Sequence, residues 1–405
     1  MGEYEQAFAQ RIGVRYAHSF SAGRVGLYGL LLAMGISDGD EVLLQVPTNI
    51  VVANAIRYTG ATPVYVDSRR DTCNMDLDDL ERRITPRAKA IVLQHTFGIP
   101  AELDQALALA RRHGLDVIED CVHALGAKYD GREVGSIGRA AFFSTEETKT
   151  ISSTMGGMVV TDDPGLAAKL EAFQASCIWP SRSLAARYLI KLLAYHVLTQ
   201  PRLHRYTRDV YERLGKRNPL PEPTTEEERR GKRPPGYHQR LSNGQSAVAL
   251  RQLRRLDENL GHRRAISSAY AERLAARGFG LPHVPAKAEA AFVRYPLWVS
   301  DRAEAVRRVA PHAVLGTWFT SVLEESESPH CAGYEAGSCP TAEQAAVHLV
   351  NLPTHLRVEL RDVEAISAAL GEATAEVQLE AGAGAGQETT SSSSGRSGGT
   401  SPASS

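Results

Sequence analysis

The sequence has little cysteine and no excess of either charge, and each scarcity excludes a class of protein. Its five cysteines are odd in number and show no metal-ligand spacing. This predicts reduced thiols packed as small apolar groups, rather than disulfides or a metal centre. The formal net charge is -1 and the pI is about 6.9, so the chain lacks the basic surplus of a general nucleic-acid binder.

Long hydrophobic runs are absent as well. The most apolar helical stretch, "ARYLIKLLAYHVL" (186–198), is too short to cross a bilayer and carries Arg187, Lys191 and His196. It predicts a buried or subunit-facing helix, with a helix on a membrane surface as the alternative. The N-terminus "MGEYEQAFAQRIGV" has neither the basic start nor the apolar centre of a signal peptide. These features favour a cytoplasmic protein with no membrane or nucleic-acid partner.

The composition that remains is ordinary for a globular protein, with 43% hydrophobic and 23% charged residues over a length that suits a large and a smaller domain. We expect a large domain over 1–245, with a helical and Pro-rich insertion at about 180–235. A long helix and a small C-terminal α+β domain would follow over 246–375. The Ser- and Gly-rich residues 376–405 cannot bury a core and predict a disordered tail.

Within the large domain, strand-like apolar runs alternate with helix-like segments. Strands are expected at 41–46, 62–67, 88–97, 115–121, 139–145 and 156–163, and helices at 3–16, 25–34, 49–60, 77–84 and 101–114. This rhythm is typical of an α/β domain built on a mostly parallel, buried sheet. Farther along, 242–278 predicts one long helix, followed by a strand at 291–299 and helices at 301–310 and 362–370.

A lone lysine stands between one of these strands and a glycine pair, in "FFSTEETKTISSTMGG". A lysine in a partly desolvated site has a neutral amine within reach near pH 7, and such an amine can bond an aldehyde. Lys149 is therefore a candidate for holding a cofactor. The alternative is an ordinary solvated surface lysine.

Two further signals precede Lys149 in the chain. The strand "LDVIEDC" ends in Glu119 and Asp120, at the point where α/β folds place their ligands. A carboxylate there could keep a pyridine nitrogen protonated, as pyridoxal phosphate requires. The Gly-rich turn "SFSAGRVG" before a helix could bind a phosphate through its backbone N–H groups, with the Ser144 hydroxyl nearby. Either feature taken alone could instead be a helix cap.

In this chain order the signals resemble the DegT/DnrJ/StrS family of sugar aminotransferases, which are pyridoxal-phosphate enzymes of the aspartate aminotransferase fold (fold type I). Other stretches that resemble the family are "GLYGLLLAMGISDGDEV", "NAIRYTGATPVYVD", "HGLDVIEDCVHALGA", "QSAVALRQLRRLDE" and "NLPTH". The resemblance covers about residues 3–370. It implies a large domain with a mostly parallel sheet flanked by helices, a small C-terminal domain, and a homodimer with shared active sites.

The resemblance also implies roles for single residues. Lys149 would hold the cofactor as a Schiff base and Asp120 would bind its pyridine nitrogen, which makes these two the catalytic candidates. The loop "GYHQR" would reach into the neighbouring subunit. The remaining candidates would bind the phosphate (Ala22, Gly23, Arg24, Ser144), the ring (His123), the cofactor from the neighbouring subunit (His238) or the substrate (Arg240).

The sequence departs from the family at several of these positions. Asn49, a further cofactor-binding candidate, stands where the family usually has an aromatic residue that stacks on the cofactor, so stacking on that side is expected to be lost. Arg24 replaces a Thr and would bring a positive charge near the phosphate. Met155 replaces a frequent Glu, and His238 replaces an Asn. These changes leave the lysine chemistry intact and leave the acceptor open.

The function that the resemblance implies is transfer of an amino group from Glu or Gln to a keto sugar, nucleotide-linked or a related cyclic ketone, in a biosynthetic pathway. One alternative is a lyase or dehydratase with the same cofactor, although relatives that dehydrate sugars carry His in place of Lys149. The other is a non-catalytic regulatory homologue. The presence of Lys149, Asp120 and Ser144 together argues for an enzyme. No metal site is expected.

Overall fold

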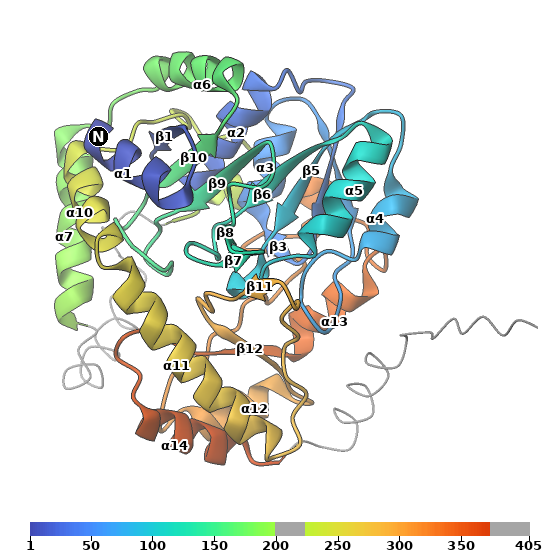
Figure 1. Cartoon of the computed structure of the whole chain (residues 1–405), viewed down its shortest axis with the longest axis vertical. Helices are drawn as coiled ribbons and strands as arrows, with labels where there is room; N and C mark the ends of the chain where they lie inside the picture. The colour runs from blue at the N-terminus through green and yellow to red at the C-terminus, as the bar shows by residue number, and fades with distance from the viewer. Residues whose placement is uncertain (199–222, 373–405) are drawn as a thin grey trace, which may run out of the picture.

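The computed structural model describes residues 1–198 and 223–372. Its centre is a seven-stranded sheet in the order β1-β10-β9-β6-β5-β2-β4, which crosses the upper half of the molecule in Figure 1. The strands from β9 to β4 run parallel, and β10 runs antiparallel between β9 and β1. The mostly parallel α/β architecture is thus confirmed. The strands are β1 (Tyr16–Phe20), β2 (Glu41–Gln45), β4 (Thr62–Val66), β5 (Ala88–Gln94), β6 (Asp116–Asp120), β9 (Ala140–Ser144) and β10 (Gly157–Thr161).

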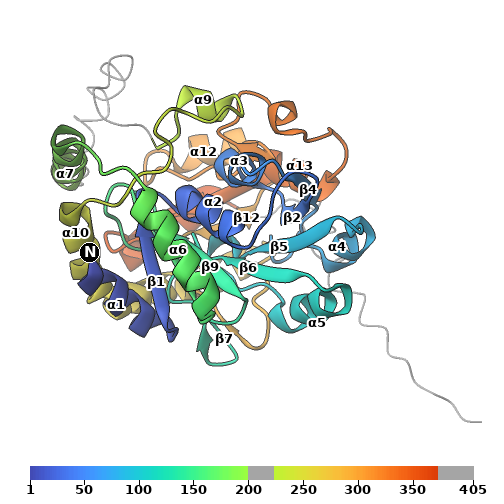
Figure 2. The ribbon, with the colours of Figure 1, turned by 90° about the horizontal axis from the view of Figure 1, so that it is seen from above.

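Helices cover both faces of this sheet because successive strand residues point to opposite sides. Val42 and Leu44 of β2 belong to one core cluster, whereas Leu43 between them belongs to the other. The first face is covered by α2 (Gly23–Ala33), α3 (Ile50–Arg57) and α6 (Pro164–Ser176). The second is covered by α1 (Gly2–Ile12), α4 (Leu77–Arg83), α5 (Leu103–His113) and α10 (Asn243–Leu253). Figure 2 shows these two layers on either side of the strands.

The C-terminal part packs around a third core cluster, below the main sheet in Figure 1. Helices α11 (Leu256–Ala275), α12 (Arg302–Val309) and α14 (Leu360–Leu370) pack with the antiparallel strands β12 (Tyr295–Trp298) and β14 (Leu349–Leu352). A short parallel pair, β3 (Thr48–Asn49) with β13 (Leu323–Glu324), joins this part to the segment that follows β2. The other short elements are η1 (Thr96–Gly98), β7 (Lys128–Tyr129), β8 (Arg132–Glu133), α9 (Glu226–Arg229), β11 (Ala288–Glu289), η3 (Pro329–Ala332) and α13 (Pro340–His348).

Two predicted helices differ from the observed ones by more than the shifts of one to three residues at their ends that the other helices show. The single helix predicted over 242–278 is the pair α10 and α11, which break at Arg254 and Arg255 although neither Gly nor Pro stands there. Gln252 holds the end of α10 in place, because its side chain accepts a hydrogen bond from the Ser152 N–H at 2.9 Å. The helix predicted over 3–16 ends earlier, at Gly13, whose φ of 83° stops a helix.

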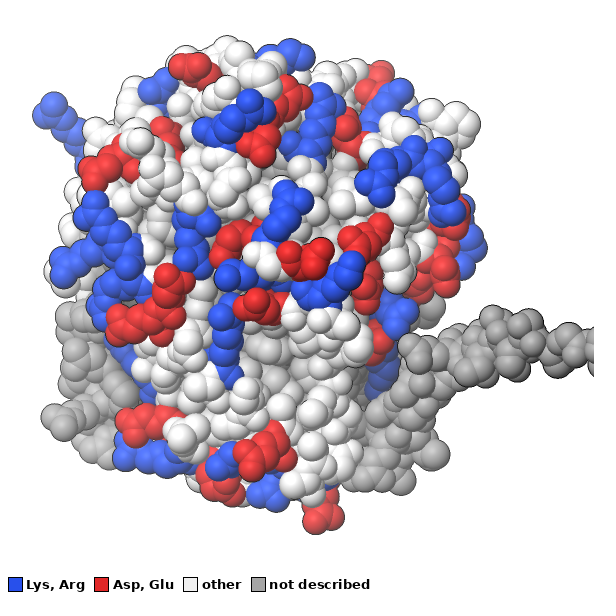
Figure 3. All heavy atoms as spheres, viewed as in Figure 1, with Lys and Arg blue, Asp and Glu red and all other residues white. Residues whose placement is uncertain are grey.

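The apolar stretch at 186–198 lies in α7 (Arg182–Leu198). Its Ile190 and Leu193 are 60% and 65% exposed, so a helix buried within this chain is wrong, and a subunit-facing one stays a prediction. The Pro-rich insertion lies partly, and the Ser- and Gly-rich tail wholly, outside the described residues. None of the described helices is long and apolar enough to cross a membrane. Figure 3 shows acidic and basic side chains interspersed on one face of the molecule.

Candidate active site

Several loops meet at one edge of the main sheet. Strands β1, β6 and β9 end there, and β10 begins there, so that Gly157 pairs with both Phe20 and Ser144. Asp120 is the last residue of β6 and Ser144 the last of β9. The parallel register therefore brings the predicted Asp, the predicted Ser and the Gly-rich turn after β1 to the same edge of the sheet.

Lys149 and Asp120 are close enough for each charge to act on the other. Lys149 lies in the loop after β9, where its backbone N–H donates to the Glu146 carbonyl at 3.1 Å. Burial lowers the pKa of Lys149 to about 8, although the negative charge of Glu146 acts in the opposite direction. Burial raises the pKa of Asp120 to about 6, and the positive charge of Lys149 offsets part of that rise. A neutral amine is therefore available at Lys149 near pH 8.

The two carboxylate oxygens of Asp120 differ in their partners. Oδ1 accepts a hydrogen bond from the Val122 N–H at 3.0 Å. Oδ2 is buried and has no hydrogen-bond partner among the described residues. A buried carboxylate oxygen without a donor costs free energy. A protonated ring nitrogen would supply the missing donor, so the site fits a pyridine cofactor at this atom.

The turn before α2 has the backbone of an anion site. Its N-cap residue, Ala22, caps none of the first helical N–H groups with its side chain. Gly157 packs against the turn so closely that a Cβ there would lie 2.4 Å from the Gly23 nitrogen. A Cβ on Gly23 would lie 3.0 Å from the Phe143 carbonyl oxygen and 3.5 Å from the Ser144 Cβ. An uncapped helix start beside a serine hydroxyl suits a phosphate group.

Arg24 follows this turn, but its charge is already paired inside the chain. Its Nε lies 2.5 Å from the Oε1 of Glu228, a buried residue of α9. A second guanidinium nitrogen donates to the Pro223 carbonyl at 2.9 Å. The added positive charge expected near a phosphate is therefore largely neutralised by Glu228, and the backbone of the turn is the stronger anion-binding element.

His123 stacks on an aromatic partner that sequence reasoning missed. The His123 and Trp318 rings have centroids 4.9 Å apart and planes 16° apart, and the Lys149 Nζ lies 4.3 Å from the Trp318 centroid. Burial lowers the pKa of His123 well below its usual value, and the charges of Lys149 and Arg294 act in the same direction. His123 is therefore a neutral ring, whose Nδ1 accepts a hydrogen bond from the Phe97 N–H at 3.4 Å.

Asn49 uses both ends of its side-chain amide. Its Oδ1 accepts a hydrogen bond from the Val51 N–H at 3.1 Å as the N-cap of α3. Its Nδ2 donates to Glu325 Oε2 at 3.1 Å, directly after β13. Asn49 thus anchors the C-terminal segment to the main sheet. The aromatic surface beside Lys149 comes instead from Trp318, and contact between Asn49 and a cofactor stays a prediction.

A comparison with known proteins agrees with this arrangement. The pattern of the DegT/DnrJ/EryC1/StrS aminotransferase family matches residues 1–371. The chain belongs to this family. Its membership confirms the predicted resemblance and the predicted enzyme class, an aminotransferase.

Individual proteins resemble this chain in sequence or in solved structure. GDP-perosamine synthase of Caulobacter vibrioides is 32% identical over 375 residues, which cover 91% of this chain and 89% of that protein. The structure of DesV from S. venezuelae has a TM-score of 0.71 at 28% identity and covers 94% of this chain and 88% of its own. Spr1654 of Streptococcus pneumoniae, solved in its PLP form, has a TM-score of 0.72 at 19% identity, covering 94% and 91%. Fold type I is thereby confirmed.

The "GYHQR" loop of this family member packs against its own α6. The Arg240 Nε donates to the Gln174 carbonyl at 2.9 Å, and its guanidinium lies 4.8 Å from the Trp179 ring centroid. The His238 Nδ1 lies 3.1 Å from an Arg233 nitrogen. The role predicted for His238 and Arg240 in a neighbouring subunit's site stays a prediction.

A buried group of possible metal ligands, His95, Glu119 and Cys121, lies just behind Asp120. The His95 Nε2 is 3.1 Å from a Glu119 oxygen, and the His95 Nδ1 accepts a hydrogen bond from the Ala101 N–H at 3.0 Å. The Glu119 carboxylate also accepts hydrogen bonds from the N–H groups of Gly135, Ile137 and Gly138. These hydrogen bonds stabilise the buried Glu119 carboxylate and fix the loop that contains Gly135, Ile137 and Gly138 against β6. We therefore interpret the group as structural.

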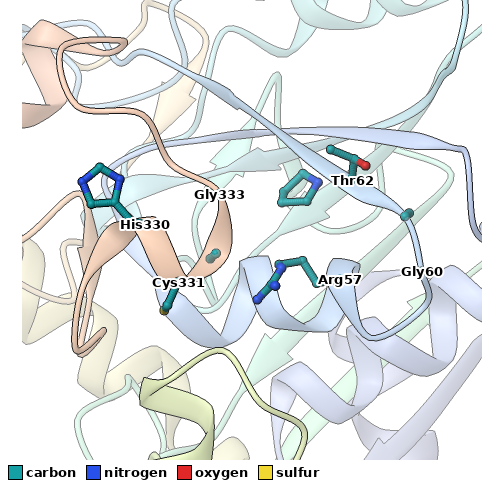
Figure 4. A pocket seen from close by; sticks show the side chains of 9 residues that line it. Arg57, Gly60, Thr62, His330, Cys331 and Gly333 are labelled. Carbon is teal, nitrogen blue, oxygen red and sulfur yellow. The ribbon is translucent and has the colours of Figure 1, made fainter.

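One surface hollow lies far from this edge. It has a volume of about 470 Å³ and is lined by residues that include Arg57, Thr62, His330 and Cys331 (Figure 4). Thr62 begins β4, so the hollow lies at the amino ends of the parallel strands. Ligands of open α/β sheets bind at the carboxyl ends, where Asp120 and Lys149 lie, and the hollow is therefore not our candidate active site.

Proposed function

We propose that this aminotransferase moves an amino group from glutamate or glutamine to a keto sugar, with pyridoxal 5'-phosphate as cofactor. The acceptor that we propose first is a nucleotide-linked keto sugar. The observation that carries the proposal is the buried pair of Lys149, with its pKa of about 8, and Asp120, with its unpartnered Oδ2. The nucleotide-linked acceptor is supported by the similarity to a GDP-perosamine synthase over 91% of the chain.

The described residues fit the cofactor at each of its three polar ends. The Lys149 amine would hold its aldehyde, Asp120 Oδ2 would bind its ring nitrogen, and the Gly23 backbone with the Ser144 hydroxyl would bind its phosphate. When bound, pyridoxal phosphate supplies the electron sink for a carbanion. His123, a neutral ring, can cover an aromatic face without adding a competing charge.

The chain's own groups can also move the proton that amino transfer requires. With a pKa of about 8, the Lys149 Nζ would move the proton from the donor's α-carbon to the cofactor carbon that carries the nitrogen, and in the second half-reaction it would move a proton from that carbon to the acceptor's carbon. The Asp120 Oδ2 would stabilise the protonated ring nitrogen of the cofactor through the same cycle. In the cofactor-free protein, the Trp318 ring beside Lys149 shields the amine from water.

We further propose a homodimer in which the loop 236–240 completes the neighbouring subunit's site. Exposed apolar residues of α7, Ile190 and Leu193, support an additional packing surface of this kind. A size measurement on the purified chain checks the dimer. An Arg240→Ala variant that lowers acceptor turnover while the mass stays dimeric would support the shared site, and a monomeric active enzyme would refute it.

The test of the function is an absorbance titration of the full chain loaded with pyridoxal phosphate. We expect a visible band that decays on addition of L-glutamate or L-glutamine and returns when a nucleotide-linked keto sugar is added. The Lys149→Ala variant should show neither the wild-type band nor the response. A loaded protein whose band ignores every amino donor would contradict the aminotransferase proposal and favour a lyase.

A further inference from the structure

One residue of helix α7 forms an ion pair with the loop that carries Lys149. This loop, the lysine loop, comprises residues 145–156 between β9 and β10. The Nζ of Lys191 lies 2.9 Å from the Oε2 of Glu147, and the two side chains are only 11% and 23% exposed. Glu147 stands two residues before Lys149, so α7 contacts the lysine loop close to its reactive residue.

Helix α7 is itself fixed against the main domain, where Figures 1 and 2 both show it beside α10. The Thr154 hydroxyl of the lysine loop donates to the Tyr188 carbonyl at 3.0 Å, and Thr154 is buried with a left-handed φ of 72°. Leu189 packs on Gly244 at the start of α10, where an added Cβ would lie 3.0 Å from the leucine Cδ1. The turn of α7 that precedes Lys191 therefore has a fixed position relative to the lysine loop.

The other long helices hold the part of the lysine loop that follows Lys149. The Asn259 side chain of α11 donates to the Thr150 carbonyl at 2.7 Å. The Gln252 side chain of α10 accepts a hydrogen bond from the Ser152 N–H at 2.9 Å. Both bonds come after Lys149 in the chain, so among the described residues the segment just before it depends on α7 for a helix contact.

The neighbours of Glu147 bond within their own segment. Glu146 accepts hydrogen bonds from the Thr148 N–H at 3.1 Å and from the Thr148 hydroxyl at 2.5 Å. Its backbone carbonyl accepts from the Lys149 N–H at 3.1 Å. These bonds join the segment into one tight turn, so a movement of Glu147 would carry Lys149 with it.

The Glu147 carboxylate needs a cation because it is largely buried. Burial raises its pKa, Lys191 offsets part of that rise, and the charge of Glu146 adds to it. Removal of one member of a buried ion pair leaves an uncompensated charge, whereas removal of both members is often nearly neutral. Without Lys191 the carboxylate would be more stable in water, and the lysine loop would have to move outward to reach it.

We infer that Lys191 is a positioning residue for the reaction: through Glu147 it keeps the loop that carries Lys149 inside the site. The inference rests on the proposed function only in taking Lys149 as the residue that holds the cofactor. It gives α7 a role within its own subunit, in addition to the packing surface proposed for its exposed Ile190 and Leu193.

The reactivity of the Lys149 amine in the cofactor-free full chain tests the inference. Formaldehyde with sodium cyanoborohydride methylates neutral amines, and peptide mass spectrometry gives the rate at Lys149 over a series of pH values. The charged groups that act on this amine are Glu146 and Asp120 from the main domain and Arg294 and Glu325 from the C-terminal part. All four are retained in the variants, so a shift in the midpoint of the profile reports a change in the burial of the amine.

The expected changes follow from the buried charge. Lys191→Gln should move the midpoint from about 8 to higher pH, because the amine loses part of its burial. A rise of about one pH unit would slow methylation at pH 8 about fivefold, since the neutral fraction falls from about a half to about a tenth. Glu147→Gln should shift the midpoint less, because a lysine can turn its charge toward solvent. The double variant Lys191→Gln/Glu147→Gln should return to the wild-type profile, because it leaves no buried charge unpaired.

Two further measurements accompany these variants. After mixing with pyridoxal phosphate, the visible band should appear in the same order of rates at pH 8 as methylation. The matched control is Lys287→Gln: Lys287 and Asp104 form an ion pair at 2.7 Å, but their side chains are 53% and 57% exposed, and neither is among the charges that act on Lys149. This variant removes the same charge from the surface, and its profile should equal that of the wild type.

The outcomes that overturn the inference are distinct. An unchanged profile for Lys191→Gln would show that Lys191 does not position Lys149. A rate that falls equally at every pH, with the midpoint unchanged, would mean that the residue only stabilises the fold. A double variant as impaired as Lys191→Gln would show that Lys191 acts by a route other than Glu147. If the wild type is methylated with a midpoint near 8 but forms no visible band with pyridoxal phosphate, the proposed function fails, and the methylation profiles still decide the inference.

Discussion

The Nζ of Lys149 lies 4.3 Å from the centroid of the Trp318 ring, across the junction between the main sheet and the C-terminal segment. An indole face attracts an ammonium group, which alone would favour the charged amine. Burial acts more strongly, since the pKa of Lys149 falls to about 8. The tryptophan therefore shields the amine more than it stabilises its charge, and the result is a reactive amine in an apolar site.

The first prediction concerns the pH at which Lys149 captures its cofactor. Only the neutral amine bonds an aldehyde, so the capture rate should rise with pH up to about 8 and then level off. A solvated lysine would give a rate that rises until about pH 10.4. Stopped-flow absorbance after mixing with pyridoxal phosphate, over a series of pH values, measures the profile. A rate still rising at pH 10 would show that Lys149 is not desolvated.

The second prediction concerns the stability cost of Asp120. Its folded pKa of about 6 is above the ordinary 3.8, so the ionised form destabilises the cofactor-free fold above pH 6. That penalty declines as the pH falls from 6 to 4 and is absent below. Asp120→Asn should therefore unfold at higher urea than wild type at pH 8, by on the order of 1–3 kcal/mol, and the difference should vanish at pH 4.

The same variant should behave in the opposite way once cofactor is added. Asn cannot balance a protonated ring nitrogen, so the loaded Asp120→Asn protein should lose most of its donor-induced band change. Urea unfolding with and without pyridoxal phosphate separates the two effects. An Asp120→Asn protein that is less stable than wild type at pH 8 without cofactor would mean that Asp120 has a purely structural role.

Local sequence predicted the candidate-site residues that end strands, and missed the side chains that reach the candidate site from the C-terminal part. Asp120 and Ser144 end strands whose apolar pattern is plain, and parallel pairing then brings them to one edge. Trp318 and Arg294 lie far along the chain, and their places depend on how the C-terminal part docks on the main sheet. No periodicity or turn signal in the sequence specifies that docking.

Asn49 and the helix break at Arg254 both show how far local sequence can predict structure. Asn is a favoured N-cap residue, so the capping role of Asn49 could have been predicted from the helix that follows it. Its bond to Glu325 could not, because that partner is distant in the chain. No Gly or Pro in the sequence marks the break after α10, which coincides with the hydrogen bond between Gln252 and Ser152. Helix propensity alone predicts that the helix continues at this point, whereas tertiary contacts end it.

The third prediction tests the phosphate turn through a glycine. A Cβ on Gly157 would lie 2.4 Å from the Ala22 carbonyl carbon and the Gly23 nitrogen, both of them backbone atoms that cannot rotate away. Gly157→Ala should therefore destabilise the chain by about 1–3 kcal/mol and weaken pyridoxal-phosphate binding at least about tenfold. Thermal unfolding and a cofactor titration measure the two effects.

Gly261→Ala serves as the control for that substitution. Gly261 lies in α11, and a Cβ added there would meet no described atom within 4 Å. Ala is also the better helix former by up to about 1 kcal/mol. This variant should be slightly more stable than wild type and should bind the cofactor unchanged. Normal cofactor binding by Gly157→Ala would show that the turn after β1 does not hold the phosphate.

The last prediction concerns the indole of Trp318 and the cofactor ring. The centroids of His123 and Trp318 are 4.9 Å apart, whereas a third ring between them would require roughly 7 Å, twice the contact distance of carbon atoms. A cofactor ring that lies against this face of His123 must displace the indole. Trp318→Ala removes that cost and should bind pyridoxal phosphate about 3- to 10-fold more tightly, the equivalent of one aromatic contact.

Two readouts make this prediction decisive. In the wild type, cofactor binding should change the emission of Trp318 as it leaves His123, and a Trp318→Phe variant, which retains a ring, should bind with an affinity close to that of wild type. The cofactor-free Trp318→Ala protein should also be less stable by about 0.5–1.5 kcal/mol, because it loses its contact with His123. Weaker cofactor binding by Trp318→Ala would give the opposite result: the indole would then stack on the bound cofactor and take over the aromatic role that Asn49 does not fill.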